Sequence, residues 1–522
     1  MKHFRIIFEP ESKQIFIHDG ATILEAAFQA GIIINTPCGG TGTCKKCSVY
    51  IMPDERKVLA CQYRIHSDIT IKIPTESRYF EPKILDHGVS GGEMHADIYE
   101  KYLKIAENGQ IFGAAIDIGT TSVVAKLIDM QDGQILATEA VLNPQSQYGD
   151  DVISRIAFAE SQQNLKILQK TIIVCINDLL QKMCEKISSS CNSIYELCEV
   201  GNTTMSHIFL GFPISQLGFS PYKAHSLDAH DLTPAKLGLK INPAGNVHTA
   251  ENIAGFVGSD TISVALAADI DSTNENTLII DIGTNGEIVL GAGNKLYAAS
   301  CAAGPAFEGA RINSGSRAAQ GAIEAVILNK NDIDFDVIGN TQARSICGTG
   351  LIDAVAVMLE LGILEKSGRF ADFDSLKEKL PDKIFERLSK HNEKSAFFLT
   401  DEVYLNQGDI RQIQLAKAAI QSGIILLLKK LNIQLNDIEK VLLAGAFGNY
   451  IRKKSALKIG LLPAISAEKI HFIGNAAASG AQMILLSSEN RNKAKQLAKN
   501  IRYIELANEP DFQDVFADCI AF

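Results

Sequence analysis

The chain has 522 residues, of which 46 % are hydrophobic and 21 % are charged, and its formal net charge is −10. This length exceeds what one hydrophobic core supports, so we expect about two to four globular domains and exclude a disordered protein. The acidic balance offers no basic face for a phosphate backbone and therefore argues against a nucleic-acid partner.

The N-terminal residues, MKHFRIIFEPESK, alternate apolar and polar side chains and lack the continuous apolar core of a secretory signal. The most apolar internal run, residues 424–428, ends at two lysines and is far shorter than the roughly 20 residues of a membrane-spanning helix. We therefore expect a cytoplasmic protein with no membrane partner. Its 11 cysteines are expected to be reduced or bound to iron, not paired in disulfides.

Strand and helix signals open the chain. Residues 3–8 and 13–17 place apolar side chains at every second position, which predicts two strands joined by a turn. Thr22 and Glu25 have the spacing of a capping box ahead of an apolar helical face, so residues 22–30 predict a helix.

Four cysteines follow this helix in the order Cys-x5-Cys-x2-Cys-x13-Cys: Cys38, Cys44, Cys47 and Cys61. Four thiolates hold a [2Fe–2S] cluster, and the glycines between the first two cysteines allow backbone amides to approach its sulfurs. The alternatives are a zinc site or unrelated core cysteines. Zinc sites usually pair their cysteines as two close couples, whereas three of these lie within ten residues, so the spacing favours the iron–sulfur cluster.

Residues 77–110 lose clear strand alternation and are interpreted as a linker. Apolar strand runs follow from residue 111, and helical stretches near 150–188 and 411–431 match the pattern of an α/β fold. Four further cysteines recur at roughly heptad intervals, which predicts one face of a helix packed in the core: Cys175, Cys184, Cys191 and Cys198.

The pentapeptide IDIGT occurs twice, at residues 116–120 and 280–284, and each copy opens a strand-turn-strand pattern. Such a turn converges backbone N–H groups and hydroxyls on an anion, while the carboxylate at the strand end can hold Mg²⁺ through water. Asp117 and Asp281 are therefore the predicted magnesium and catalytic residues. The predicted phosphate-binding residues are Gly119, Thr120, Thr121, Gly283, Thr284 and Asn285. Two such turns on opposite lobes would enclose one triphosphate.

Two family resemblances follow from these motifs. Residues 1–76 resemble the plant- and adrenodoxin-type ferredoxins of β-grasp fold, with a shortened last cysteine gap. From residue 111 onward the chain resembles the actin-like ATPase superfamily. In its terms IAGFVGSDTISVALAADI (253–270) and IGNAAASGAQMI (473–484) look like the interlobe connections. VLLAGAFGNYI (441–451) looks like the adenosine motif, which assigns Gly445 and Gly448 to ATP.

The combination resembles the reductive activators of corrinoid enzymes. The resemblance implies an α/β multidomain protein with a β-grasp [2Fe–2S] domain at 1–76 and the linker at 77–110. A two-lobed, ribonuclease H-like actin-type ATPase would occupy 111–522, with lobes of about 111–275 and 276–522. It also implies ATP, Mg²⁺ and the cluster as cofactors, an upstream electron donor, and a corrinoid protein of a methyl-transfer system as the partner that is reduced from Co(II) to Co(I). The sequence leaves open whether the chain forms a homodimer.

Three alternatives belong to other classes. The large domain could be a nucleotide-binding scaffold without hydrolysis, attached to a simple electron-transfer module, or the chain could be a small-molecule kinase with a redox-sensing cluster. Activators of 2-hydroxyacyl-CoA dehydratases share the ATPase fold, but their cluster bridges two subunits, whereas this chain holds four ligands. The sequence leaves open whether Glu308 or Asp353 lies near the metal. It favours buried thiols at tight turns for Cys301 and Cys347.

Overall fold

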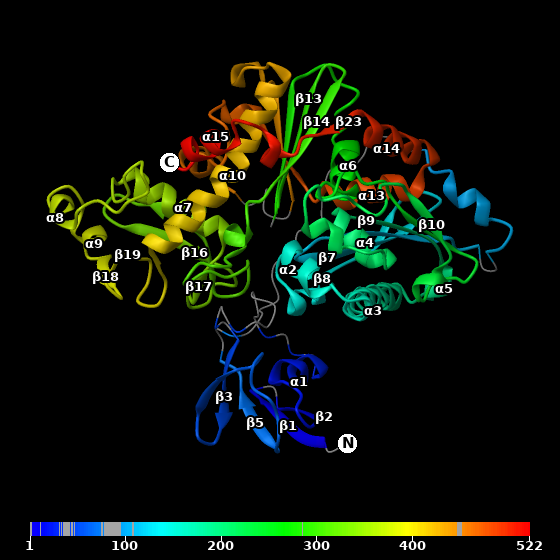
Figure 1. Ribbon diagram of the computed structural model, residues 1–522, viewed down its shortest axis with the longest axis horizontal. Helices are drawn as coiled ribbons and strands as arrows, with labels where there is room; N and C mark the ends of the chain where they lie inside the picture. The colour runs from blue at the N-terminus through cyan, green and yellow to red at the C-terminus, as the bar shows by residue number, and fades with distance from the viewer. Residues whose placement is uncertain are drawn as a thin grey trace.

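The computed structural model describes residues 3–10, 12–30, 32, 34, 42, 45, 47–74, 77, 95–106, 109–283, 285–445 and 451–522. In these residues the strands form one five-stranded sheet, two six-stranded sheets and two three-stranded sheets. Figure 1 shows the five-stranded sheet, in blue, below the two six-stranded sheets. In the described part of the chain, no helix combines the length and the apolar character needed to cross a membrane.

The N-terminal sheet has the strand order β2-β1-β5-β3-β4 and is covered by helix α1 (Ile23–Gln29). The predicted hairpin is confirmed, since β1 and β2 pair antiparallel, and β1 also pairs in parallel with β5. The capping box is confirmed too, because Glu25 Oε2 accepts from Thr22 N at 2.6 Å and Thr22 Oγ1 accepts from Glu25 N at 3.1 Å. The strands are β1 (His3–Glu9), β2 (Lys13–His18), β3 (Ser48–Met52), β4 (Arg56–Leu59) and β5 (Ile69–Lys72).

The middle sheet has the order β10-β11-β9-β6-β7-β8. β6, β7 and β8 form an antiparallel meander, and β9 and β11 extend it in parallel from β6. The long helix α3 (Gln162–Lys186) packs its apolar side on one face of this sheet. The strands are β6 (Phe112–Ile118), β7 (Ser122–Asp129), β8 (Ile135–Leu142), β9 (Ile194–Gly201), β10 (His230–Leu232) and β11 (Asn246–Thr249).

The C-terminal sheet repeats this plan with the order β22-β21-β12-β13-β14-β23. Its meander β12-β13-β14 is again extended in parallel, here by β21 and β22. The two IDIGT copies therefore occupy the same position, at the end of the first meander strand, as their repetition predicted. The strands are β12 (Thr277–Ile282), β13 (Gly286–Ala292), β14 (Lys295–Cys301), β21 (Lys440–Ala444), β22 (Ile470–Gly474) and β23 (Ile501–Tyr503).

Smaller elements complete the two halves. An inserted region between β14 and α10 holds the three-stranded sheets, formed by β15 (Ala322–Leu328), β16 (Ile333–Val337), β17 (Ser345–Ile346), β18 (Leu388–His391), β19 (Lys394–Phe398) and β20 (Tyr404–Asn406). The remaining longer helices are α2 (Val152–Phe158), α4 (Thr203–Leu210), α7 (Gly348–Glu360), α10 (Gln407–Leu431), α12 (Lys453–Lys458) and α15 (Phe512–Asp518). Helices thus occupy the stretches predicted near 150–188 and 411–431.

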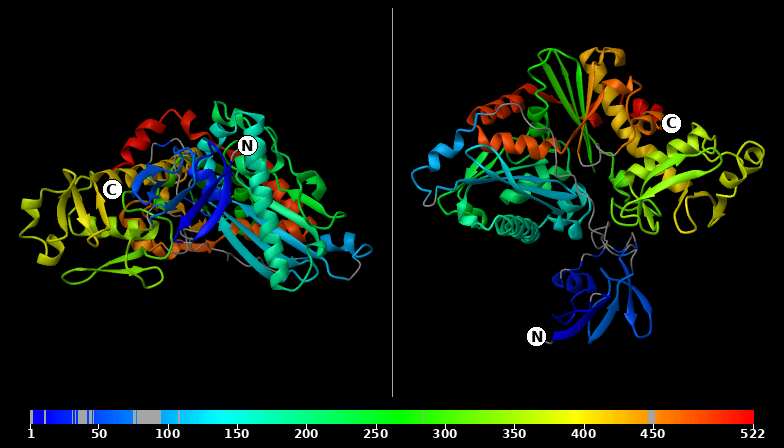
Figure 2. Two further views of the ribbon diagram at one scale, coloured as in Figure 1. Left: turned by 90° about the horizontal axis from the view of Figure 1, so that it is seen from below. Right: turned by 180° about the vertical axis from the view of Figure 1, so that it is seen from behind.

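Helices α6 (Ser259–Ala267) and α13 (Ala476–Leu486) lie between the two six-stranded sheets and share one apolar core with both (Figures 1 and 2). The two helices approach so closely that a Cβ atom added to Gly480 would lie 2.1 Å from the carbonyl oxygen of Ser263. The absence of a side chain at Gly480 permits this close packing. Helix α14 (Ser488–Asn500) follows α13 and leads into β23.

The prediction that four cysteines share one helix face is wrong. Cys175 and Cys184 lie on α3, which ends at Lys186, whereas Cys191 begins a 3-10 turn and Cys198 lies on β9. Their intervals match a heptad only by coincidence across a helix-to-strand boundary. The thiols of Cys198, Cys301 and Cys347 are buried. Burial raises the pKa of each thiol, as expected for cysteines in a protein core.

Candidate nucleotide and iron–sulfur sites

A cleft of about 200 Å³ opens where the two IDIGT turns face each other. It is lined by residues of the β6–β7 and β12–β13 turns together with the starts of α6 and α13. The structure brings together eight of the residues predicted for ATP or magnesium: Asp117, Gly119, Thr120, Thr121, Asp281, Gly283, Asn285 and Gly445. Thr284 and Gly448, also predicted to bind ATP, lie outside the described residues.

The first turn is held in place by buried polar side chains behind it. Asn143 donates to the carbonyl oxygen of Gly119 at 2.8 Å, and the fully buried Arg155 donates to that of Thr120. The Thr120 hydroxyl accepts from the side chain of Asn202 at 3.0 Å. Because these carbonyl oxygens are held from behind, the turn can present its N–H groups and hydroxyls to a ligand in the cleft.

The second turn depends on a close approach of backbone and carboxylate. Gly445 follows β21 with a φ of +87°, and a Cβ at this position would lie 2.4 Å from Oδ1 of Asp281. A side chain here would therefore displace the predicted magnesium ligand. In addition, the N–H of Gly283 donates to the carbonyl oxygen of Asn285 at 3.0 Å, which closes the turn.

Several carboxyl groups line the cleft, among them Asp117, Asp260, Asp281 and Glu287. Burial, together with the charge of Asp260, raises the pKa of Asp117 and of Asp281 to about 7. Burial likewise raises the pKa of Asp260 to about 6 and that of Glu287 well above its usual range. Raised carboxyl pKa values in a cleft are typical of catalytic and cation-binding sites.

The charge of this cleft restricts what it can bind. Among the described residues that line it there is no lysine or arginine. In the described part of the chain, no three Asp, Glu, His or Cys side chains are close enough to hold a metal ion directly. A polyphosphate would therefore need its own cation, and these oxygen donors suit Mg²⁺, which usually keeps several waters in protein sites.

Glu308 links the two halves across the cleft. Its Oε2 accepts from Oγ1 of Thr121 at 2.6 Å, and Nε of Arg317 lies 3.6 Å from the same oxygen. Asp353, the other acid left open from the sequence, is buried elsewhere, and its Oδ2 lies 3.4 Å from Nε of Arg452. Of the two, the structure places Glu308 beside the phosphate turn and Asp353 away from it.

Of the four predicted cluster ligands, the structure describes Cys47 and Cys61, while Cys38 and Cys44 lie outside the described residues. Pairing of β3 with β4 brings the two together, and Ala60 N donates to the carbonyl oxygen of Cys47 at 2.9 Å. Both side chains are buried, and Sγ of Cys47 lies 3.3 Å from Sγ of Cys61, which is too far for a disulfide bond. Two cysteine sulfurs at this separation fit ligands that converge on one iron.

Comparisons with known proteins cover nearly all of the chain. Its residues match three family models: a 2Fe-2S iron-sulfur cluster binding domain at 7–66, the RACo middle region at 112–273, and the C-terminal domain of RACo, the ASKHA domain, at 275–522. The chain is 32 % identical to the corrinoid activation enzyme RamQ of Eubacterium limosum, with 98 % of each chain covered. The chain belongs to the family of corrinoid reductive activators.

Two further proteins are similar to the chain. The [Co(II) methylated amine-specific corrinoid protein] reductase of Methanosarcina barkeri is 23 % identical over 78 % of this chain and 76 % of its own. The solved reductive activator for corrinoid, iron-sulfur protein superposes with a TM-score of 0.70 at 30 % identity, covering 99 % of this chain and 98 % of that one. The matches confirm the predicted family, the [2Fe–2S] domain and the actin-like nucleotide-binding fold.

Three residues that line the cleft were not predicted from the sequence. Asp260 lies in the first turn of α6, and Asn202 and Asn475 cap α4 and α13 while reaching Thr120 and Asp117. A signal was present, because Gly-Asn stands between an apolar strand and a helix at both 201–202 and 474–475. This second repeat accompanies the IDIGT repeat in each half of the fold.

Proposed function

We propose that this chain is an ATP-dependent reductive activator that returns a corrinoid protein from Co(II) to Co(I). The observation that carries the proposal is that one chain joins a cluster-binding domain to a carboxylate-lined cleft between two duplicated halves. Support comes from relatives of nearly the same extent whose names describe corrinoid activation. The partner would belong to a methyl-transfer system, and the electron would come from a separate donor protein in the cytoplasm.

The energy requirement explains why the two parts are joined. Plant-type [2Fe–2S] clusters have potentials near −400 mV, and we expect the corrinoid couple to lie lower. A gap of about 200 mV costs about 4.6 kcal/mol for one electron. Nucleotide binding and hydrolysis can offset this cost if they change how tightly the activator holds the two oxidation states of its partner, since a ligand shifts an equilibrium only through differential affinity.

Each group of residues has a role in this proposal. Cys38, Cys44, Cys47 and Cys61 would hold the cluster, which when bound supplies a one-electron donor. Asp117 and Asp281 would hold Mg²⁺ through water and orient the attacking water, and a carboxyl pKa of about 7 suits proton acceptance near neutral pH. The two turns would bind the phosphates, with Gly445 and Gly448 toward the adenosine.

We further propose that residues 1–76 and 111–522 act as two units joined by residues 77–110, with lobes of about 111–275 and 276–522. The duplicated sheet plan and the family matches that divide between residues 273 and 275 support this division. Closure of these lobes on a nucleotide would be the motion that hydrolysis reverses. The proposed closure of the lobes does not require the chain to form a homodimer.

The deciding experiment is anaerobic. Reduced protein is mixed with candidate Co(II) corrinoid proteins, and the cobalt absorption spectrum is followed with ATP, with ADP and without nucleotide. We expect Co(I) only with ATP, and loss of both Co(I) formation and phosphate release in Asp281→Asn. Co(I) formation at the same rate without ATP would indicate a simple electron-transfer protein. ATP turnover that needs a phosphoryl-accepting metabolite would indicate a kinase.

A further inference from the structure

Part of the expected linker is packed into the main body. In η2 (Ile98–Tyr102), Ile98 and Tyr102 are buried in the apolar core that α6 and α13 share with both six-stranded sheets. The ring of Tyr102 also packs against that of Tyr195 on β9, with centroids 5.2 Å apart. The segment that leads from the iron–sulfur domain to β6 is therefore attached to the core that contains helices α6 and α13.

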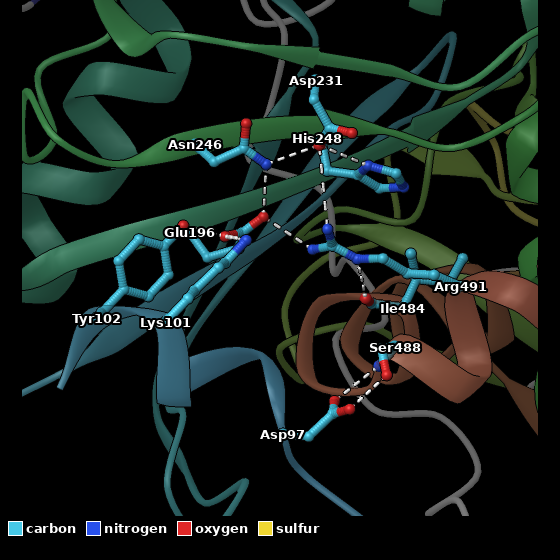
Figure 3. Close-up of polar contacts among 10 residues, drawn as sticks. All are labelled: Asp97, Lys101, Tyr102, Glu196, Asp231, Asn246, His248, Ile484, Ser488 and Arg491. Atoms are coloured by element: carbon cyan, nitrogen blue, oxygen red, sulfur yellow. Dashed lines mark hydrogen bonds and ion pairs between the residues drawn. The ribbon is translucent and has the colours of Figure 1, made fainter.

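The attachment centres on Glu196, a fully buried carboxylate on β9 (Figure 3). Its oxygens accept from Nζ of Lys101 at 2.8 Å, from Nη2 of Arg491 at 2.8 Å, from Nδ2 of Asn246 at 2.7 Å and from the hydroxyl of Tyr102. Burial alone would raise the pKa of Glu196, but Arg491 and Lys101 hold it below its usual value. The group is thus a carboxylate shared by donors from separate segments.

A second carboxylate fastens the same segment to α14. Asp97 accepts from the backbone N–H of Ser488 at 2.8 Å and from its hydroxyl, at the first residue of the helix. The N–H of Asp97 donates to the carbonyl oxygen of Leu486 at 3.2 Å, the last residue of α13. We call Asp97, Lys101, Tyr102, Glu196 and Arg491 the anchor cluster.

Helix α14 crosses between the two halves of the fold. Arg491 ties it to the middle sheet through Glu196, and its guanidinium also donates to the carbonyl oxygen of Ile484 on α13 at 3.0 Å. The chain then enters β23, which pairs with β14 of the C-terminal sheet. Lys493, two residues after Arg491, pairs with Asp271 at 3.2 Å, just beyond the first connection through α6. A rotation of one sheet against the other must therefore move α14 relative to at least one of these contacts.

We propose that the anchor cluster couples the nucleotide cleft to the placement of the iron–sulfur domain, with Glu196 as its positioning residue. This inference depends on the proposed function for its purpose but not for its geometry. Cleft closure would shift α14, the anchor cluster would move residues 95–106 with it, and the attached domain would change its position toward a partner. A purely structural cluster would stabilise the fold without responding to nucleotide.

The variants are Glu196→Gln, which keeps the shape but removes the shared charge, and Lys101→Met, which removes one cation. The side chain of Lys101 is 46 % exposed, so its replacement leaves a folded protein to test if the first variant does not fold. Lys186→Met is the matched control, because Lys186 pairs with Glu139 at the opposite side of the middle sheet. None of these residues lines the nucleotide cleft.

The first measurement is hydrogen exchange of backbone amides in 95–106 and α14, with Mg²⁺ and either ADP or a non-hydrolysable ATP analogue. In the unaltered chain and Lys186→Met we expect the analogue to change exchange in both segments by about threefold or more. In the two cluster variants the change should be confined to α14. Equal exchange in 95–106 with and without nucleotide in the unaltered chain would overturn the proposal.

The second measurement counts ATP hydrolysed per Co(I) formed. Glu196→Gln and Lys101→Met should hydrolyse ATP within about twofold of the unaltered rate but use about fivefold more ATP per Co(I). A parallel fall in both rates would show a structural role only and would overturn the inference. If no corrinoid partner yields Co(I), the proposed function fails, whereas the exchange result still decides the coupling between cleft and segment.

Discussion

The hydroxyl of Thr121 donates a 2.6 Å hydrogen bond across the cleft to Oε2 of Glu308, so the first phosphate turn is bonded to a carboxylate of the opposite half. A phosphate that takes the Thr121 hydroxyl as its own donor must break this bond. It would also face the charge of Glu308 beside the other carboxylates of the cleft. The charge of Glu308 therefore disfavours the binding of a nucleotide that carries no bound cation.

Replacing this charge should change the cation requirement. We expect Glu308→Gln to bind ATP in the absence of Mg²⁺ about fivefold more tightly, because removing one unit charge at contact distance is worth about 1 kcal/mol in a solvated cleft. Titration with a fluorescent ATP analogue in chelator and in Mg²⁺ measures the effect. Glu360→Gln, an exposed carboxylate on α7, is the control. Unchanged or weaker Mg²⁺-free binding would show that Glu308 does not face the phosphates.

Nucleotide binding should depend on pH through the cleft carboxyls. Since burial and Asp260 raise the pKa of Asp117 and Asp281 to about 7, both are partly protonated near neutrality and must lose protons to hold Mg²⁺. Affinity for Mg²⁺–ATP should rise from about pH 6 to about pH 8 with release of protons, which calorimetry in two buffers of different ionisation enthalpy measures. The stability of the nucleotide-free protein should show the opposite trend and fall as pH rises from about 4 to about 7.

The same argument gives a variant. Asp260→Asn removes a negative charge that raises the pKa of both Asp117 and Asp281, so the midpoint of the affinity curve should move to lower pH. The amide oxygen can still accept from Thr261 N, which lies 2.6 Å from Oδ1 of Asp260. A midpoint that stays in place would mean that other groups control the titration.

Much of the fold and of the cleft could be predicted from the sequence, because the patterns that indicate them lie within a few consecutive residues. Each IDIGT copy contains its strand, its turn and its carboxylate within five residues, so both halves of the cleft could be located. The capping box at Thr22 is equally local. Asp260 and the anchor cluster could not be found in this way. Glu196 and Arg491 are 295 residues apart, and only the packing of α14 against the middle sheet makes them partners.

The cluster ligands can be tested one at a time. Cys61→Ser should lose the visible absorption and most of about two iron atoms per chain, because four thiolates are needed to hold the cluster. Iron analysis and absorption after anaerobic reconstitution measure the loss, and ATP hydrolysis should continue. Cys175→Ser, a thiol on α3, should retain full iron. Equal iron in both variants would remove Cys61 from the ligand set.

Gly445 provides a test of the cleft geometry itself. A Cβ atom at Gly445 would lie 2.4 Å from Oδ1 of Asp281, and the φ of +87° at Gly445 disfavours every residue other than glycine. We expect Gly445→Ala to lower the rate of ATP hydrolysis by about 100-fold, since a displacement of about 1 Å at a reacting centre can have this effect. The cluster and its absorption should be unaffected.

The control for this variant separates backbone strain from displacement of the carboxylate. Gly293 also has a positive φ, of +54°, but a Cβ there would meet no atom within 4 Å, and it lies in the β13–β14 turn away from the cleft. We therefore expect Gly293→Ala to lower the free energy of unfolding by about 1 kcal/mol through backbone strain alone. The rate of ATP hydrolysis should stay unchanged. Should both variants lose stability and activity to the same extent, the contact between Gly445 and Asp281 would have no special part in catalysis.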